Sequence, residues 1–129
     1  KRQDIGGERG EKLYDIFLDT KHRLYSCAYW KEDTKSLEEA QQNKIDHIVK
    51  KLDIKQGQKI LEVGCGWGGM AFEIAKQKNC EVTAISLSKN QINYCKNMTR
   101  LVYERLFSHI TLLTTCCLKT CIFSRFDYF

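Results

Sequence analysis

The sequence of 129 residues has no proline, no long apolar run and no cluster of basic residues. The absence of proline excludes a collagen-like chain. A membrane-spanning helix needs about 20 predominantly apolar residues, so the lack of such a run disfavours a transmembrane protein. The chain begins with Lys1 instead of Met and has no basic-then-apolar leader, which disfavours a secreted protein and suggests a fragment or a processed chain. With 43% apolar and 29% charged residues, the composition predicts one modest globular domain.

The positive charge is spread along the whole chain. There are 21 Lys and Arg residues against 16 Asp and Glu residues, a formal net charge of +5. A nucleic-acid-binding protein usually concentrates its basic residues on one face or one tail, so we expect no nucleic-acid partner. A weak attraction to an anionic membrane surface is compatible with the small positive excess.

Seven cysteines are present, and they form no CxxC pair. An odd number without a leader disfavours a disulfide framework. Cys116, Cys117 and Cys121 lack the spacing and the fourth ligand of a zinc site. We therefore expect no metal site, and reduced thiols of the kind found in cytoplasmic proteins.

The first third of the chain predicts helical elements around an aromatic segment. Residues 1–11 are polar and glycine-rich, which is typical of an irregular segment, and residues 13–18 predict one or two helical turns. The aromatic rings of residues 25–30 favour core packing, with the lining of a ligand pocket as the alternative. A capping box at Ser36 and Glu39 predicts a helix to about Leu52. Its expected apolar stripe is Ile45, Ile48, Val49 and Leu52.

The middle of the chain alternates strand and helix patterns. Residues 59–63 predict a short buried strand that enters a glycine-rich loop, and residues 70–76 predict a helix. Residues 81–86 predict a second strand, and a second capping box at Ser88 and Gln91 opens another helix. This order predicts the first half of a doubly wound α/β domain.

The glycine loop indicates a ligand site. A strand that runs through closely spaced glycines into a helix lets a ligand approach the backbone and the free N–H groups of the helix start. A dinucleotide site expects an acidic residue at the end of the second strand, where this chain has Ser86, Leu87 and Ser88. Glu62 instead stands just before the first glycine, which favours S-adenosylmethionine. Glu62 would bind its amino group, with a strand-end salt bridge as the alternative; Gln91 would bind its ribose, act only in the capping box, or do both.

Four motifs resemble those of the cyclopropane-fatty-acyl-phospholipid synthases, which include the mycolic-acid cyclopropane synthases. They are Tyr-Ser-Cys-Ala-Tyr-Trp at residues 25–30, Ser-Leu-Glu-Glu-Ala-Gln at 36–41, Ile-Leu-Glu-Val-Gly-Cys-Gly-Trp-Gly-Gly at 60–69 and Ser-Leu-Ser-Lys-Asn-Gln at 86–91. The resemblance covers residues 12–99. It implies an α/β fold: an incomplete Rossmann-like class I S-adenosylmethionine-dependent methyltransferase domain with an N-terminal helical cap.

The resemblance also implies roles for individual residues. Tyr25 and Ser26 would close over S-adenosylmethionine, and Cys27 would contact a bicarbonate ion that acts as the base. The methionine part would be held by Leu61, Glu62, Val63, Gly64, Cys65, Gly66, Trp67, Gly68 and Gly69. The ribose and adenine side would be held by Ser86, Leu87, Ser88, Lys89, Asn90 and Gln91. Tyr29 and Trp30 are candidates for lining an apolar substrate site.

The implied reaction is methyl(ene) transfer to the cis double bond of an unsaturated phospholipid acyl chain, a step of lipid biosynthesis that forms cyclopropane fatty acids. A cytoplasmic location with peripheral contact at the inner face of the membrane follows from that substrate, and a homodimer is one option for the full-length form. The alternatives are a small-molecule N-methyltransferase of the same superfamily and an inactive fragment that binds S-adenosylmethionine or does not fold.

Three regions follow from these patterns. Residues 1–56 would form the helical segment through which substrate enters, and residues 57–99 the first half of the Rossmann-like domain. Residues 100–129 would be a divergent or aberrant tail, for which we hypothesise a shifted reading frame. The resemblance is expected to end at about Thr99, and two strands are clear; a divergent strand pair is the alternative for the tail.

Overall fold

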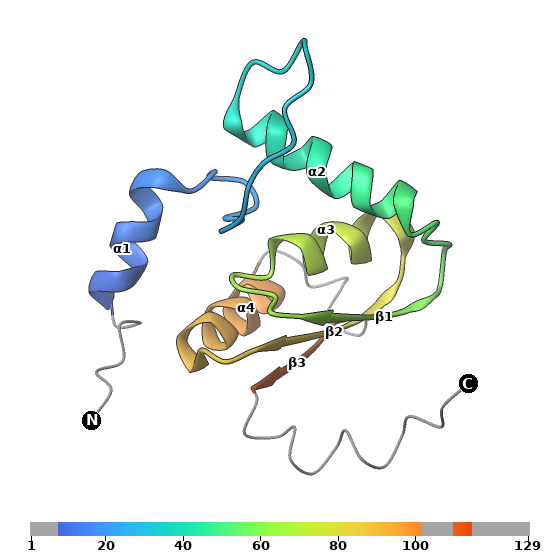
Figure 1. The fold of residues 1–129 in the computed structure, drawn as a ribbon. Helices are drawn as coiled ribbons and strands as arrows, with labels where there is room; N and C mark the ends of the chain where they lie inside the picture. Colours follow the sequence, from blue (N-terminus) through green and yellow to red (C-terminus); the bar gives the residue numbers. More distant parts are fainter. Residues whose placement is uncertain (1–7, 102–109, 115–129) are drawn as a thin grey trace.

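A parallel sheet with helices packed on it forms the centre of the computed structural model, which describes residues 8–101 and 110–114 (Figure 1). The sheet has the order β1-β2-β3, and both neighbouring pairs are parallel. Its elements are α1 (Glu8–Phe17), α2 (Leu37–Lys51), β1 (Lys59–Val63), α3 (Gly69–Lys78), β2 (Glu81–Ser86), α4 (Lys89–Leu101) and β3 (Ile110–Thr114). The predicted α/β class is confirmed.

The helices α3 and α4 cover one face of the sheet, and α2 packs on α3 (Figure 1). Both strand–helix–strand connections run in the same direction across the sheet, and right-handed crossovers in one direction place their helices on one face. The buried core lies between these layers. It includes Ile45 and Val49 from α2, Phe72 and Ala75 from α3, Val82 and Ala84 from β2, and Ile92 and Cys95 from α4. Each large aliphatic side chain buried there contributes about 1.5–3 kcal/mol.

The strand β1 is less buried than the sequence predicts. In the described part of the chain it pairs only with β2, from Lys59 opposite Glu81 to Val63 opposite Ile85. Successive side chains of a strand point to opposite faces, and Ile60 and Glu62 are the partly buried ones. Leu61 and Val63 remain 47% and 75% exposed, so the buried-strand prediction was wrong for this face.

The helix α2 begins as predicted and ends slightly differently. The Ser36 hydroxyl accepts a hydrogen bond from the Glu39 N–H at 3.2 Å, while the Glu39 carboxylate accepts from the Lys35 N–H. At the other end Asp53 is left-handed (φ +50°), and the Ile54 N–H bonds back to the Val49 carbonyl. This turn buries Ile54 and leaves Leu52 65% exposed, so the predicted stripe is wrong at its last position.

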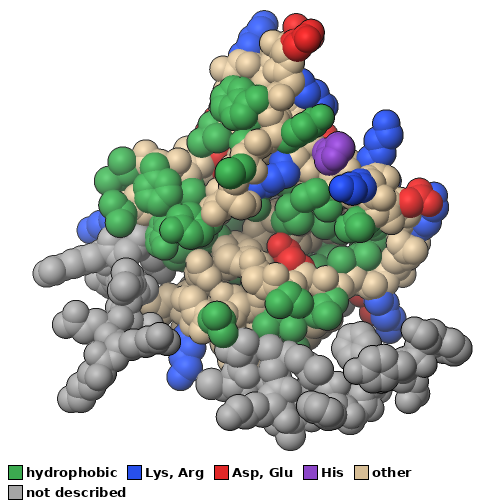
Figure 2. All heavy atoms as spheres, viewed as in Figure 1, with side chains coloured by type: hydrophobic (Ala, Val, Ile, Leu, Met, Phe, Trp, Pro, Cys, Tyr) green, Lys and Arg blue, Asp and Glu red, His purple; other side chains and the backbone are tan. Residues whose placement is uncertain are grey.

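Two further elements lie outside the regions where they were expected. The helix α1 begins at Glu8, inside the segment predicted to be irregular. Three of its apolar residues, Leu13, Ile16 and Phe17, are exposed, and Figure 2 shows hydrophobic side chains gathered over this helix. The strand β3 adds a third parallel strand to the two clear ones and lies in the region predicted to be a divergent or aberrant tail. The cysteine cluster at residues 116–121 lies outside the described residues.

None of the helices in the described ranges is both long and apolar enough to cross a membrane. The division of the chain at residues 56 and 99 stays a prediction.

Candidate functional site

The glycine loop joins the carboxyl end of β1 to the first turn of α3. Gly64, Gly66 and Gly68 have positive φ angles of 85°, 54° and 83°, which only glycine adopts without strain. The Gly64 and Cys65 N–H groups both donate to the Ile85 carbonyl, at 2.8 and 3.0 Å. The end of β2 therefore holds the loop in place, and the start of α3 faces the same edge of the sheet.

The glycines of this loop fall into two classes. A Cβ at Gly64 or Gly66 would meet no atom within 4 Å, so these two positions leave open space beside the backbone. A Cβ at Gly68 would lie 2.8 Å from the Cys95 sulfur, and one at Gly69 would overlap the His22 carbonyl. The first two glycines thus permit a ligand to approach, whereas the last two permit the close packing of α4 and the N-terminal segment.

Glu62 carries a largely buried carboxyl group next to this open space. Burial raises its pKa from 4.5 to about 7, and a hydrogen bond from the Ala71 backbone only partly offsets the shift. Its Oε2 atom is buried without a hydrogen-bond partner among the described residues. Glu62 forms no salt bridge with any of these residues, so the strand-end salt bridge considered above is wrong. A buried carboxylate with one oxygen left without a partner is suited to binding a cationic group.

The segment after β2 is ordered by its own side chains. The Ser86 hydroxyl donates to Gln91 Oε1 at 2.7 Å and accepts from the Ser88 N–H at 3.2 Å. The Gln91 N–H donates to the Ser88 hydroxyl at 3.4 Å, as the capping box predicts. The Gln91 side chain, however, turns to Ser86 and not to the Ser88 backbone. Leu87 is 83% exposed beside this network.

The segment Tyr25–Cys27 is anchored by α2 and lies on the surface. Lys44 Nζ donates to the Ser26 hydroxyl at 2.9 Å, and Gln41 Nε2 donates to the Ser26 carbonyl at 3.1 Å. Burial lowers the pKa of Lys44. Tyr25 is 63% exposed and Cys27 is exposed as well, so core packing is wrong for this part of the aromatic segment.

The other two aromatic residues of that segment are also exposed. The Tyr29 ring lies 4.8 Å from the His47 ring of α2, and the Tyr29 N–H donates to the Ala40 carbonyl. Trp30 is 56% exposed. Core packing was therefore the wrong interpretation here too, and the lining role of these two residues stays a prediction.

Two cysteines lie beneath the loop. Cys65 and Cys95 are buried, and each sulfur lies 3.8 Å from the Gly66 carbonyl oxygen. A hydrogen bond between the two thiols lowers the pKa of Cys65, and the same bond, together with burial, raises that of Cys95. Cys65 is only 4% exposed, so its small side chain packs inside the loop. No group of three metal-ligating side chains occurs among the described residues.

Sequence reasoning missed two residues at this site. Tyr14 of α1 packs edge-on against Trp67 of the loop, with ring centroids 5.4 Å apart, and also against Tyr25 at 5.2 Å. Arg23 lies over the Trp67 ring. No local pattern marks either residue, because their contacts come from elements far apart in the sequence.

The sequence matches a protein-family model and several known proteins. The family model described as "Mycolic acid cyclopropane synthetase" matches residues 6–112, further along the chain than the expected end at Thr99. The chain is 40% identical over 88 residues to the cyclopropane-fatty-acyl-phospholipid synthase of Escherichia coli K12, an alignment that covers 68% of this chain and 22% of that enzyme. It thus spans about a fifth of the length of that relative.

Two solved structures have a similar fold. One is the mycolic acid cyclopropane synthase CmaA1 complexed with SAH and CTAB, with a TM-score of 0.72 and 33% identity over 80% of this chain and 35% of that one. The other is coclaurine N-methyltransferase bound to N-methylheliamine and SAH, with a TM-score of 0.72 and 28% identity over 81% of this chain and 30% of that one. The fold is therefore a partial class I methyltransferase domain.

Proposed function

Because the chain belongs to the mycolic acid cyclopropane synthetase family, we propose that its glycine loop binds S-adenosylmethionine. The whole protein would transfer the methyl(ene) group to the cis double bond of an unsaturated phospholipid acyl chain. Similarity to the E. coli synthase and to an SAH-bound synthase supports this proposal.

The observation that carries the proposal is the buried Oε2 atom of Glu62, which no described residue bonds. S-adenosylmethionine has an ammonium group at its amino-acid end, and this carboxylate oxygen can accept a charge-assisted hydrogen bond from such a group. The open space beside Gly64 and Gly66 leaves room for the rest of that end of the molecule. A merely structural loop would have no need of either feature.

The remaining ligand contacts are assigned by position. Residues 86–91, arranged around the Ser86–Gln91 hydrogen bond, would hold the ribose and adenine. Tyr25 and Ser26 would close over the ligand from the segment that α2 anchors. Cys27 would contact bicarbonate. The Lys44 ammonium bonds the hydroxyl of the adjacent Ser26, and its positive charge would favour an anion there.

In the proposed reaction the side chains mainly have to align the methyl group with the alkene. The sulfonium of bound S-adenosylmethionine makes its methyl group electrophilic. The protein therefore has to orient that methyl group against the alkene and exclude water from it. The aromatic rings of Tyr14, Phe17 and Tyr25 would supply an apolar wall beside the loop, which suits an acyl chain and a developing cation. Peripheral contact with the cytoplasmic face of the membrane and a homodimeric full-length form remain proposals that follow from the substrate and the family.

A second candidate is a small-molecule N-methyltransferase, which the similarity to coclaurine N-methyltransferase favours. Assays of the full-length protein with unsaturated phospholipid vesicles and with secondary amines would separate the two activities. If the 129-residue chain binds S-adenosylmethionine without turnover on either substrate, it is an inactive binding fragment.

The first test is a calorimetric titration of the folded chain with S-adenosylmethionine. We expect Glu62→Gln to weaken binding about 30-fold or more, because loss of a buried charged partner costs about 2–5 kcal/mol. The control is Glu81→Gln, which changes an exposed carboxylate at the opposite end of the sheet and should leave affinity unchanged. Absence of binding by the folded wild-type chain, or equal affinity of Glu62→Gln, would contradict the proposed site.

A further inference from the structure

Arg23 lies at the point where the N-terminal segment meets the glycine loop and α4. Its guanidinium carbon is 4.7 Å from the ring centroid of Trp67 and 4.8 Å from that of Tyr94. These two rings meet edge to face at 5.1 Å. A planar cation can contact both rings at once, so one side chain joins the loop to α4.

The same guanidinium also contacts α1. Arg23 Nη1 donates to Asp15 Oδ1 at 2.6 Å, and the Arg23 side chain is only 16% exposed. Its Nε and Nη2 atoms are buried and have no hydrogen-bond partner in the described part of the chain. Two ring contacts and one ion pair therefore hold the group in place, and a lysine ammonium cannot reproduce that planar arrangement.

The backbone around Arg23 is constrained to point the side chain at the loop. Arg23 has a φ of +51°, a strained angle for a residue with a side chain. The buried Asp19 carboxylate accepts hydrogen bonds from the N–H groups of His22 and Leu24, the two residues that flank Arg23. The His22 carbonyl rests against the backbone of Gly69. Strain that the surroundings maintain in this way is typical of functional positions.

We infer that Arg23 is a positioning residue that couples the docking of α1 to the conformation of the glycine loop. Trp67 stands between Gly66 and Gly68, so a change in the loop moves the ring on which Arg23 rests. Docking of α1 and binding at the loop then favour each other, and such coupling is reciprocal. The ligand part of this inference rests on the proposed binding of S-adenosylmethionine, whereas the docking of α1 does not.

Hydrogen exchange of the backbone amides of α1, measured with and without S-adenosylmethionine, tests the coupling. In the wild-type chain we expect the ligand to slow exchange in α1 several-fold. In Arg23→Met we expect α1 to exchange about tenfold faster without ligand, and S-adenosylmethionine to bind about five- to tenfold more weakly. Arg23→Lys should fall between the two, because it keeps the charge and loses the planar contact.

The matched control is Lys21→Met, which removes a neighbouring cation that bonds Gln42 of α2. It should change neither exchange in α1 nor affinity. Exchange in α2 should be the same in the wild type and the Arg23 variants, which separates a local effect from general destabilisation. Unchanged α1 exchange in ligand-free Arg23→Met would overturn the inference by itself. Ligand binding that leaves α1 exchange unaltered in the wild type would overturn the coupling, whereas absence of binding by the wild type would overturn the proposed function.

Discussion

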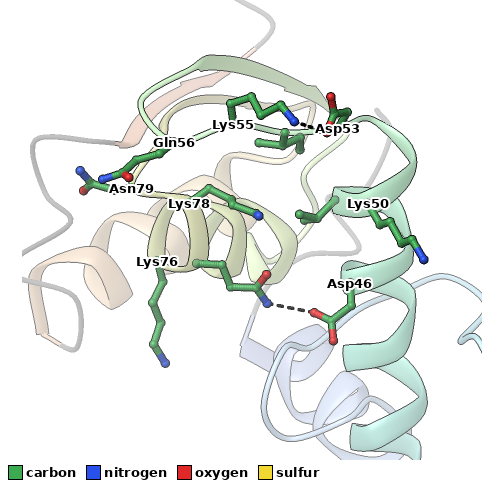
Figure 3. Close-up of a pocket in the computed structure, with 11 residues that line it drawn as sticks. Asp46, Lys50, Asp53, Lys55, Gln56, Lys76, Lys78 and Asn79 are labelled. Atoms are coloured by element: carbon green, nitrogen blue, oxygen red, sulfur yellow. Dashed lines mark hydrogen bonds and ion pairs between the residues drawn. The ribbon is translucent and has the colours of Figure 1, made fainter.

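The two ends of the sheet differ in the size of their cavities and in whether they bury a polar atom without a hydrogen-bond partner. At the amino ends of β1 and β2 lies a cavity of about 720 Å³ between the last turns of α2 and α3 (Figure 3). Near the carboxyl end of β1, a cavity beside Trp67 has a volume of only about 20 Å³, and Glu62, Gly64 and Gly66 do not line it. Yet the carboxyl end of β1 has both the buried Glu62 Oε2 atom, which no described residue bonds, and the positive-φ glycines with open space.

Both carboxylates at the large cavity already have partners. Asp53 pairs with Lys55, and Asp46 accepts a hydrogen bond from Gln77 (Figure 3). The lysines at the ends of α2 and α3 match the negative ends of the helix dipoles. Cavity volume alone does not indicate a ligand, whereas a buried polar atom without a hydrogen-bond partner indicates a missing partner. The second signal is the better guide to a ligand.

The largest effect should come from the titration of Glu62 in the ligand-free chain. Its pKa is raised from 4.5 to about 7 on folding, so the folded state binds the proton more tightly than the unfolded state. The stability this provides is present below about pH 4.5 and is lost as the pH rises to about 7, a decrease of about 3 kcal/mol in the free energy of unfolding.

Urea unfolding between pH 4.5 and 8 measures this decrease. Glu62→Gln should flatten the profile over this range, while Glu81→Gln at the other end of the sheet should keep its slope. A wild-type profile that matches that of Glu62→Gln would show that the carboxyl group is not held as the structure has it.

A smaller effect is expected from a pair of equivalent glycines. Gly66 and Gly57 both have positive φ, and a Cβ would meet nothing within 4 Å at either one. Substitution by alanine at either position should therefore lower the free energy of unfolding by about 1 kcal/mol. Only Gly66→Ala should weaken S-adenosylmethionine binding, by roughly 30-fold or about 2 kcal/mol, because its methyl group enters the proposed ligand space. Calorimetry and thermal unfolding of both variants measure the two effects, and equal affinities would place the ligand elsewhere.

The smallest expected effect compares two ion pairs. Arg23 and Asp15 are 2.6 Å apart with the arginine side chain 16% exposed, whereas Lys55 and Asp53 are 2.5 Å apart with both side chains more than 60% exposed. Asp15→Asn should destabilise the chain by about 1 kcal/mol and Asp53→Asn by less than about 0.5 kcal/mol. Denaturant unfolding at low and high salt measures both, and the reverse order would contradict the difference between the two ends.

Local patterns predicted much of this site. The glycines at 64–69, the acidic residue before them and the capping box at Ser88 and Gln91 are all sequence features, and the structure places them at one edge of the sheet. The sequence could not predict which glycines leave open space and which permit close packing. That difference depends on Cys95 and His22, which contact the loop from elements distant in the sequence. The roles of the individual ligand-binding residues stay predictions.

The sequence by itself determined the order β1, α3, β2 and α4, the starts of α2 and α4, and the glycine loop, since each depends on residues within a few positions of one another. Only the tertiary structure decided that the Glu62 Oε2 atom has no partner among the described residues, that β1 exposes Leu61 and Val63, and that Arg23 bridges α1, the loop and α4. Burial and charge compensation are properties of the surroundings of a side chain. Those surroundings are assembled from segments whose spacing along the chain carries no sign of their contact.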